Sequence, residues 1–153
     1  MNDGPYPLIF VHQVTGTYLE TDNYNDNVGE AVQTWNLDPP MATKGFLGHK
    51  WLLHKNPDES FLIKSFENQR CLTASATNAS DYPRLQNCDG NPTQDWLFQR
   101  ASDDPDTYAI IPKLYPGYAL GIQYNVLSNN AYVVPIPTWG RPTFFHYWRI
   151  TPL

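Results

Sequence analysis

The apolar positions of the chain fall into three similar segments. Each segment begins with an apolar run, passes a turn that contains Gly or Asn, and reaches a second short stretch that contains Leu. An apolar run, a turn residue and a second apolar run together predict two short antiparallel strands. In chain order, the runs and their leucines are Leu8–Val11 with Leu19, Phe61–Ile63 with Leu72, and Tyr108–Ile111 with Leu120.

A tryptophan closes each segment. Trp51 and Trp96 each follow a polar pair and precede two apolar residues, and Trp148 follows His146-Tyr147 and precedes Arg149-Ile150. The leucines and the tryptophans both recur with a period of roughly 50 residues, which gives three units with room for about four strands each. Because one such unit is too small to bury its apolar face alone, we expect three units around a pseudo-threefold axis, with the tryptophans in one shared core.

Composition agrees with an all-β domain and excludes several classes of protein. Charged residues make up only 16% of the chain, whereas aromatic residues reach 14% and there are 14 prolines, as is typical of short strands joined by long turns. The net charge of −5 argues against nucleic acid as a partner. No apolar run is long enough for a transmembrane helix, so we expect no membrane insertion.

Catalytic and metal-binding signatures are missing from the sequence. It contains no P-loop, no HExxH, no Gly-x-Ser-x-Gly and no dinucleotide-binding fingerprint. The four histidines are scattered, and the two cysteines do not form a CxxC pair. We therefore expect neither an enzyme nor a bound metal or cofactor.

The first residues carry neither the basic region nor the apolar region of a signal peptide. The chain is then either the mature form of a secreted protein or a protein made without a signal peptide. We expect a secreted or extracellular-acting protein, with a cytoplasmic protein as the alternative.

The middle segment carries a more specific pattern. Cys71-Leu72-Thr73-Ala74 opens it, Cys88 follows a short apolar stretch, and Gln94-Asp95-Trp96 closes it. This segment resembles a repeat of the ricin-B type β-trefoil lectins, which have a Cys-Leu-x-Ala opening, a second Cys and a closing Gln-x-Trp. The match is specific over residues 61–99. It is looser in the flanking segments, which have His in place of the closing Gln and lack the cysteines.

The resemblance implies a single β-trefoil domain over residues 1–153, with repeats at approximately 5–55, 58–100 and 105–153. It implies non-catalytic binding of glycans, of the galactose type in this family. The two cysteines of such a repeat usually form a disulfide, which implies a Cys71–Cys88 bond. Two buried free thiols in a cytosolic protein are the alternative.

The resemblance also implies that the sugar site is best formed in the first repeat. An aromatic face would stack on the sugar ring, while an acid and an amide would hydrogen-bond its hydroxyl groups. A solvated surface acid and a partly buried strand tryptophan are the alternative interpretations of the acid and the aromatic residue. The implied site residues are Glu20, or Asp22 as the near alternative for the acid, together with Gln33, Trp35 and His49.

The other two repeats depart from this pattern. In the second repeat Thr73 replaces the acid and Gln86 replaces the aromatic residue; in the third, Gly121 and Val134 do so. A different polar pocket could form in the second repeat, although Gln94 could instead hold a turn through backbone hydrogen bonds. The residues of this possible second site are Asp81, Tyr82, Arg84, Asn87 and Gln94.

Two other functions stay open at this point. The chain could be the receptor-binding or carrier subunit of a multicomponent toxin, with aromatic residues such as Tyr132, Trp139 and Phe144 in interfaces with the partner chains. It could instead be a trefoil protease inhibitor that acts through the proline-containing loop at residues 38–45.

Overall fold

The structure is a computed structural model of the chain. It describes residues 7–21, 26–35, 48–102, 104–122, 131–135 and 146–152. Within these ranges the named elements are twelve β-strands and one short 3-10 helix, so the predicted all-β class is confirmed.

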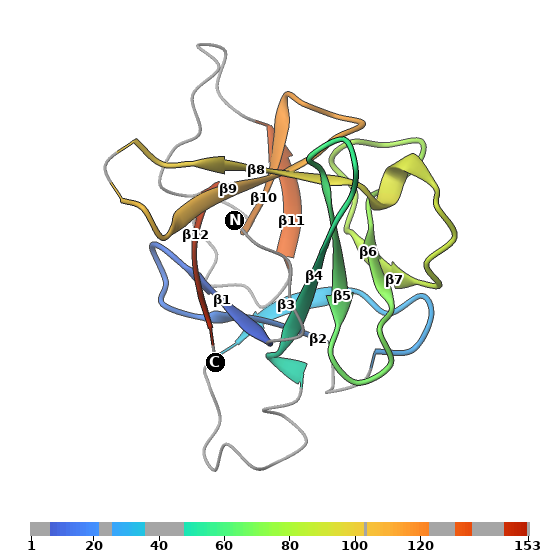
Figure 1. The fold of residues 1–153 in the computed structure, drawn as a ribbon, viewed down its shortest axis with the longest axis horizontal. Helices are drawn as coiled ribbons and strands as arrows, with labels where there is room; N and C mark the ends of the chain where they lie inside the picture. The colour runs from blue at the N-terminus through green and yellow to red at the C-terminus, as the bar shows by residue number, and fades with distance from the viewer. Residues whose placement is uncertain are drawn as a thin grey trace.

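The strands fall into three consecutive groups of four, which we call the first, second and third repeats (Figure 1). The first repeat contains β1 (Leu8–His12), β2 (Tyr18–Thr21), β3 (Val32–Trp35) and β4 (Trp51–Lys55). The second contains β5 (Phe61–Ser65), β6 (Cys71–Thr73), β7 (Arg84–Gln86), the 3-10 helix η2 (Pro92–Gln94) and β8 (Trp96–Arg100). The third contains β9 (Thr107–Pro112), β10 (Tyr118–Ile122), β11 (Ala131–Pro135) and β12 (Tyr147–Pro152).

Among the described strands, the first and last of each repeat close into a barrel. The ring runs β1–β12–β9–β8–β5–β4 and returns to β1, with antiparallel pairing at every step. The two middle strands of each repeat pair with each other as β2–β3, β6–β7 and β10–β11, drawn in blue, yellow-green and orange in Figure 1. Closing the ring gives each of these six described strands a partner on both sides, which protects the barrel from pairing with other chains.

Alternation along the strands builds the core. In β5, Phe61, Ile63 and Ser65 are buried, while the two residues between them are half-buried. This is the period of two that a strand requires when one face packs inward. Repeated across the barrel, it gives one cluster in which residues such as Phe10, Leu53 and Ile110 meet.

The three tryptophans lie in this core, as the sequence predicts, and each makes the same hydrogen bond. Trp51, Trp96 and Trp148 have no exposed surface. The indole Nε1 of each donates to the carbonyl oxygen of the leucine in its own repeat. The partners are Leu19 at 2.9 Å, Leu72 at 2.9 Å and Leu120 at 3.0 Å. Each bond ties the first strand of the hairpin to the last barrel strand of the same repeat.

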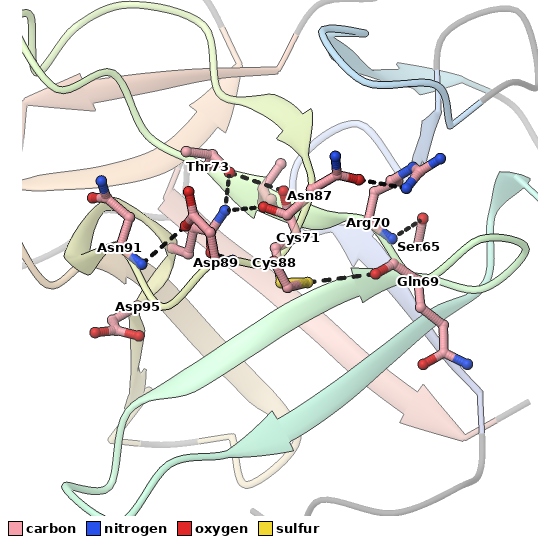
Figure 2. Close-up of a disulfide and its surroundings, with 12 residues drawn as sticks. Ser65, Gln69, Arg70, Cys71, Thr73, Asn87, Cys88, Asp89, Asn91 and Asp95 are labelled. Atoms are coloured by element: carbon pink, nitrogen blue, oxygen red, sulfur yellow. Dashed lines mark hydrogen bonds between the residues drawn. A yellow bond between two sulfur atoms is a disulfide. The ribbon is translucent and has the colours of Figure 1, made fainter.

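The Cys71–Cys88 disulfide is present, with the Cα atoms 5.2 Å apart. Cys71 begins β6 and is buried, whereas Cys88 lies two residues beyond the end of β7 and is exposed. The bond therefore closes the open end of the β6–β7 hairpin, as Figure 2 shows. The pairing implied by the family resemblance is confirmed, and the alternative of two free thiols is wrong.

We expect Trp96→Ala to lower the free energy of unfolding by about 3–5 kcal/mol, since it empties a core position. The substitution also removes the indole donor to the Leu72 carbonyl. Guanidinium unfolding followed by far-UV circular dichroism measures the change. Leu114→Ala is the control, because Leu114 is 45% exposed and should change stability by less than about 0.5 kcal/mol. Equal losses in the two variants would contradict a core role for Trp96.

We expect the double variant Cys71→Ala/Cys88→Ser to be less stable than the wild type by about 3 kcal/mol, because the unfolded chain regains the freedom of the closed loop. Alanine is chosen at position 71 because that side chain is buried. Dithiothreitol should lower the unfolding midpoint of the wild type toward that of the variant and leave the variant unchanged. A variant as stable as the oxidised wild type would show that the disulfide contributes nothing.

Candidate functional site

Three of the five side chains expected at the first-repeat site come together at the β2–β3 hairpin. Glu20 and Gln33 stand directly opposite each other in the register of β2 and β3. Gln33 Nε2 donates to Glu20 Oε1 at 2.6 Å. His49 Nε2 lies 2.8 Å from Glu20 Oε2. Each oxygen of the carboxylate therefore faces a nitrogen from a different segment of the chain.

The tryptophan bond explains why His49 reaches the carboxylate. Trp51 is held against the Leu19 carbonyl. His49 precedes Trp51 by two residues and Glu20 follows Leu19 directly. The core hydrogen bond thus brings the segments that carry His49 and Glu20 side by side.

This cluster is buried except for its amide. The side chains of Glu20 and His49 are 1% and 0% exposed, and the Tyr18 ring packs edge-on against His49 with the ring centroids 5.6 Å apart. Gln33 is only half-buried. Burying a carboxylate without partners is costly, and Gln33 and His49 reduce that cost here. The interpretation of Glu20 as a solvated surface acid is therefore wrong.

The other two expected residues of this site cannot be placed in the same detail. Asp22 lies outside the described residues, and so does the side chain of Trp35. The backbone of Trp35 ends β3 and pairs with Tyr18, two positions beyond Gln33. Their roles in binding stay predictions.

The strand registers support the comparison between repeats. Trp35, Gln86 and Val134 pair with Tyr18, Cys71 and Ala119, respectively, so the three stand at equivalent positions in their hairpins. These equivalences are the ones drawn from the sequence.

In the second repeat a neutral pair, Thr73 and Gln94, takes the place of Glu20 and His49. Gln94 Nε2 donates to Thr73 Oγ1 at 3.2 Å and to the Asn87 carbonyl at 2.8 Å. Gln94 Oε1 accepts from the Asp89 backbone N–H at 3.1 Å. With 1% of its surface exposed, Gln94 holds the turn after β7. Figure 2 shows Thr73, Asn87 and Asp89 close together beside the disulfide.

The other residues expected in a second pocket make contacts of their own. An Arg84 guanidinium nitrogen donates to the Gly29 carbonyl of the first repeat at 3.0 Å. Asn87 Oδ1 accepts from Arg70 (Figure 2). Asp81 accepts from the Tyr82 backbone N–H at 2.8 Å. A second sugar pocket stays a prediction.

In the third repeat Gly121 stands where Glu20 does, opposite Tyr132 in the register, and His146 is buried at the position of His49. The side chain of Tyr132 and the whole of Trp139 and Phe144 lie outside what the structure describes. The candidate inhibitor loop at residues 38–45 lies outside it as well.

Sequence reasoning missed the buried role of Asp26, which precedes β3 and is 3% exposed. Asp26 Oδ2 accepts from Ser65 Oγ at 2.6 Å and from the Asn68 backbone N–H at 2.8 Å, and Oδ1 accepts from Asn68 Nδ2 at 2.6 Å. Burial acts to raise the pKa of Asp26, but the hydrogen bonds from Ser65 and Asn68 outweigh it and hold the pKa below its ordinary value. These partners lie 39 and 42 residues away, so no local pattern could have indicated them.

Two kinds of feature are absent from the described part of the chain. There, no three or more His, Cys, Asp or Glu side chains are grouped so that they could hold a metal ion. No helix in the same ranges has the length and apolar character needed to cross a membrane.

No family model matches the sequence, and no curated protein matches it. Solved structures do match. A designed threefold-symmetric protein, ThreeFoil, is 19% identical with a TM-score of 0.77 over 97% of this chain and 98% of its own. The C-terminal half of an earthworm R-type lectin, solved in complex with GalNAc, is 16% identical with a TM-score of 0.65 over 97% of this chain and 100% of its own. The fold is a β-trefoil.

A third match is to one part of a longer chain. The whole of this chain matches 18% of a mosquitocidal holotoxin, with 14% identity and a TM-score of 0.78. The trefoil thus corresponds to the full length of ThreeFoil and of the lectin half, but to only a part of the toxin chain.

We expect Glu20→Ala to destabilise the trefoil by about 3 kcal/mol, because Gln33 would lose its acceptor and the buried His49 would lose the carboxylate that it faces. Chemical unfolding monitored by tryptophan fluorescence measures the change. Glu67→Ala is the matched control, since Glu67 is exposed in the turn between β5 and β6. A Glu20 variant as stable as the Glu67 variant would mean that the cluster contributes nothing to folding.

Proposed function

We propose that the trefoil is a non-catalytic glycan-binding module whose main site is the β2–β3 hairpin of the first repeat. The observation that carries this proposal is the buried Glu20 carboxylate, which fixes the half-buried amide of Gln33 from beneath. A sugar site needs a few polar groups in fixed orientations beside an apolar surface, and this cluster supplies the fixed polar groups.

Gln33 is the best-placed contact for a sugar hydroxyl among the described residues. One of its two amide hydrogens is directed to Glu20. The amide oxygen and the second hydrogen can therefore accept from and donate to a ligand. Such dual capacity suits a hydroxyl group, which is itself a donor and an acceptor.

Glu20 and His49 are proposed mainly as the buried pair that holds the Gln33 amide in its orientation. Since a carboxylate has about four acceptor positions, Glu20 could also accept from a sugar hydroxyl that reaches it. Trp35 is proposed as the stacking platform, because residues two apart in a strand share a face.

Binding at a single site of this kind should be weak. A few hydrogen bonds and one stacked ring must offset the cost of ordering the ligand, which suggests dissociation constants of roughly 10⁻³–10⁻⁵ M. Galactose-type glycans are the first candidates, because the family resemblance implies them. The match to a lectin half solved with GalNAc supports the same choice of probes.

A glycan array is the direct test, with Gln33→Ala and Trp35→Ala compared with the wild type. We expect the folded wild type to bind galactose- or GalNAc-terminated glycans, Gln33→Ala to bind at least tenfold more weakly, and Trp35→Ala to lose the signal. Gln99→Ala is the matched control, since Gln99 is an exposed residue of β8 in the second repeat. An array without signal for the folded wild type, or an unchanged signal for Gln33→Ala, would refute the proposed site.

The toxin match favours one further candidate function: that the trefoil is the receptor-binding part of a toxin assembly.

The Cys71–Cys88 bond supports a location outside the reducing cytosol, because disulfides persist mainly in oxidising compartments. We propose that the protein acts outside the cell that makes it. Co-purification of partner chains from the native source, together with an array signal, would support the toxin role, and a lone chain that binds glycans would support an independent lectin.

A further inference from the structure

The connection between β2 and β3 is fastened to the second repeat. Asp26, within this connection, accepts three hydrogen bonds from Ser65 and Asn68, at 2.6, 2.8 and 2.6 Å. Ser65 ends β5, and Asn68 lies in the turn between β5 and β6. Hydrogen bonds to an ionised carboxylate are roughly twice as strong as neutral ones, so Asp26 is a firm attachment.

A second attachment lies a few residues further along. The backbone N–H of Gly29 donates to the Leu85 carbonyl at 2.6 Å, and the backbone N–H of Leu85 donates to the Glu30 carbonyl at 2.8 Å. The stretch from Asp26 to Glu30 is thus attached to the neighbouring repeat at both of its ends.

These attachments lie beside the proposed glycan site. Asp26, Ser65 and Phe66 line a narrow crevice together with Thr21 and Gly48. Thr21 directly follows Glu20 and Gly48 directly precedes His49. The crevice that Asp26 lines is therefore also lined by Thr21 and Gly48, the chain neighbours of Glu20 and His49.

The segment that carries His49 leans on the same turn. The Lys50 ammonium lies 5.0 Å from the centroid of the Phe66 ring, a cation–π contact. The turn after β5 thus contacts both Asp26, in the connection that follows β2, and Lys50, the chain neighbour of His49.

We propose that Asp26 is a positioning residue for the first-repeat glycan site, and that the β5–β6 turn of the second repeat is the support against which it holds that site. This inference rests on the proposed function. It assigns part of the site's geometry to a residue that need not touch the sugar, and it makes binding in one repeat depend on side chains of the next.

A swap of the acid and the amide tests the inference. In Asn68→Asp, a second carboxylate faces Asp26 where the amide nitrogen now donates, and the two like charges repel. In the double variant Asp26→Asn/Asn68→Asp, the amide introduced at position 26 can donate to the carboxylate introduced at position 68. The oxygen of that amide still accepts from Ser65 and from the backbone N–H at position 68. The double variant has the same net charge as the wild type.

The measurements are the affinity for immobilised GalNAc-terminated glycan and the melting temperature, with binding assayed well below the melting temperature of every variant. We expect Asn68→Asp to weaken binding at least fivefold and the double variant to recover the wild-type affinity to within twofold. Asn78→Asp is the matched control, because Asn78 is exposed in the β6–β7 connection of the same repeat. It should bind as the wild type does.

The outcomes separate this inference from the proposed function. A folded wild type that binds no glycan refutes both. A wild type that binds, with a folded Asn68→Asp variant of equal affinity, refutes the positioning role alone, even if the melting temperature of the variant falls. A folded double variant that stays as weak as Asn68→Asp also refutes the positioning role, because restored hydrogen bonds would then have failed to restore the site.

Discussion

The hydrogen bond from an indole to a leucine carbonyl is the constraint on which the rest of the trefoil depends. It occurs once in each repeat, at Trp51, Trp96 and Trp148, with nearly equal lengths. An indole N–H buried without an acceptor would cost about 1–3 kcal/mol, so the carbonyl that satisfies it is fixed in place. The bond joins two strands that do not pair with each other, and it sets where the hairpin meets the barrel.

The same constraint recurs in each repeat, but the side chains beside it differ between repeats. In the first two repeats, the residue after the leucine lies near the residue two before the tryptophan. In the first repeat these residues are Glu20 and His49, and in the second they are Thr73 and Gln94. The first pair is ionisable and supports an amide at the surface, whereas the second is neutral and holds a turn. A repeated frame with different side chains would allow one repeat to carry the proposed binding site while its neighbour serves mainly as scaffold.

The sequence allowed the fold to be predicted because its signals are local and repeated. The recurring leucines and tryptophans predicted the three units, and the register places Trp35 and Gln86 at equivalent positions, as the sequence comparison did. The contact of Glu20 with Gln33 could be predicted as well, because both residues belong to one short hairpin. The burial of Glu20 was harder to predict: the resemblance grouped His49 with Glu20, but nothing near Glu20 in the chain indicates that the acid is shielded from solvent.

The contacts between repeats could not be predicted from these local patterns. Asp26 stands in a stretch of polar residues that looks solvated, yet its partners come from a turn about 40 residues away that packs against it only in the folded barrel. A period in the sequence describes each unit but not how one unit touches the next. For this reason a residue that joins two repeats leaves no mark in the pattern of either one.

The ring of six strands has a consequence for how the chain could be rearranged. Leu8 and Pro152 stand opposite each other where β1 meets β12, so the two ends of the described chain adjoin across a single rung of the barrel. The pairings in a closed ring do not depend on which strand comes first in the chain. A circular permutant that joined these ends through a short linker and opened at the exposed turn near Asp58 would retain every barrel pairing, and the opening would fall between β4 and β5, outside the segments that carry Glu20 and His49.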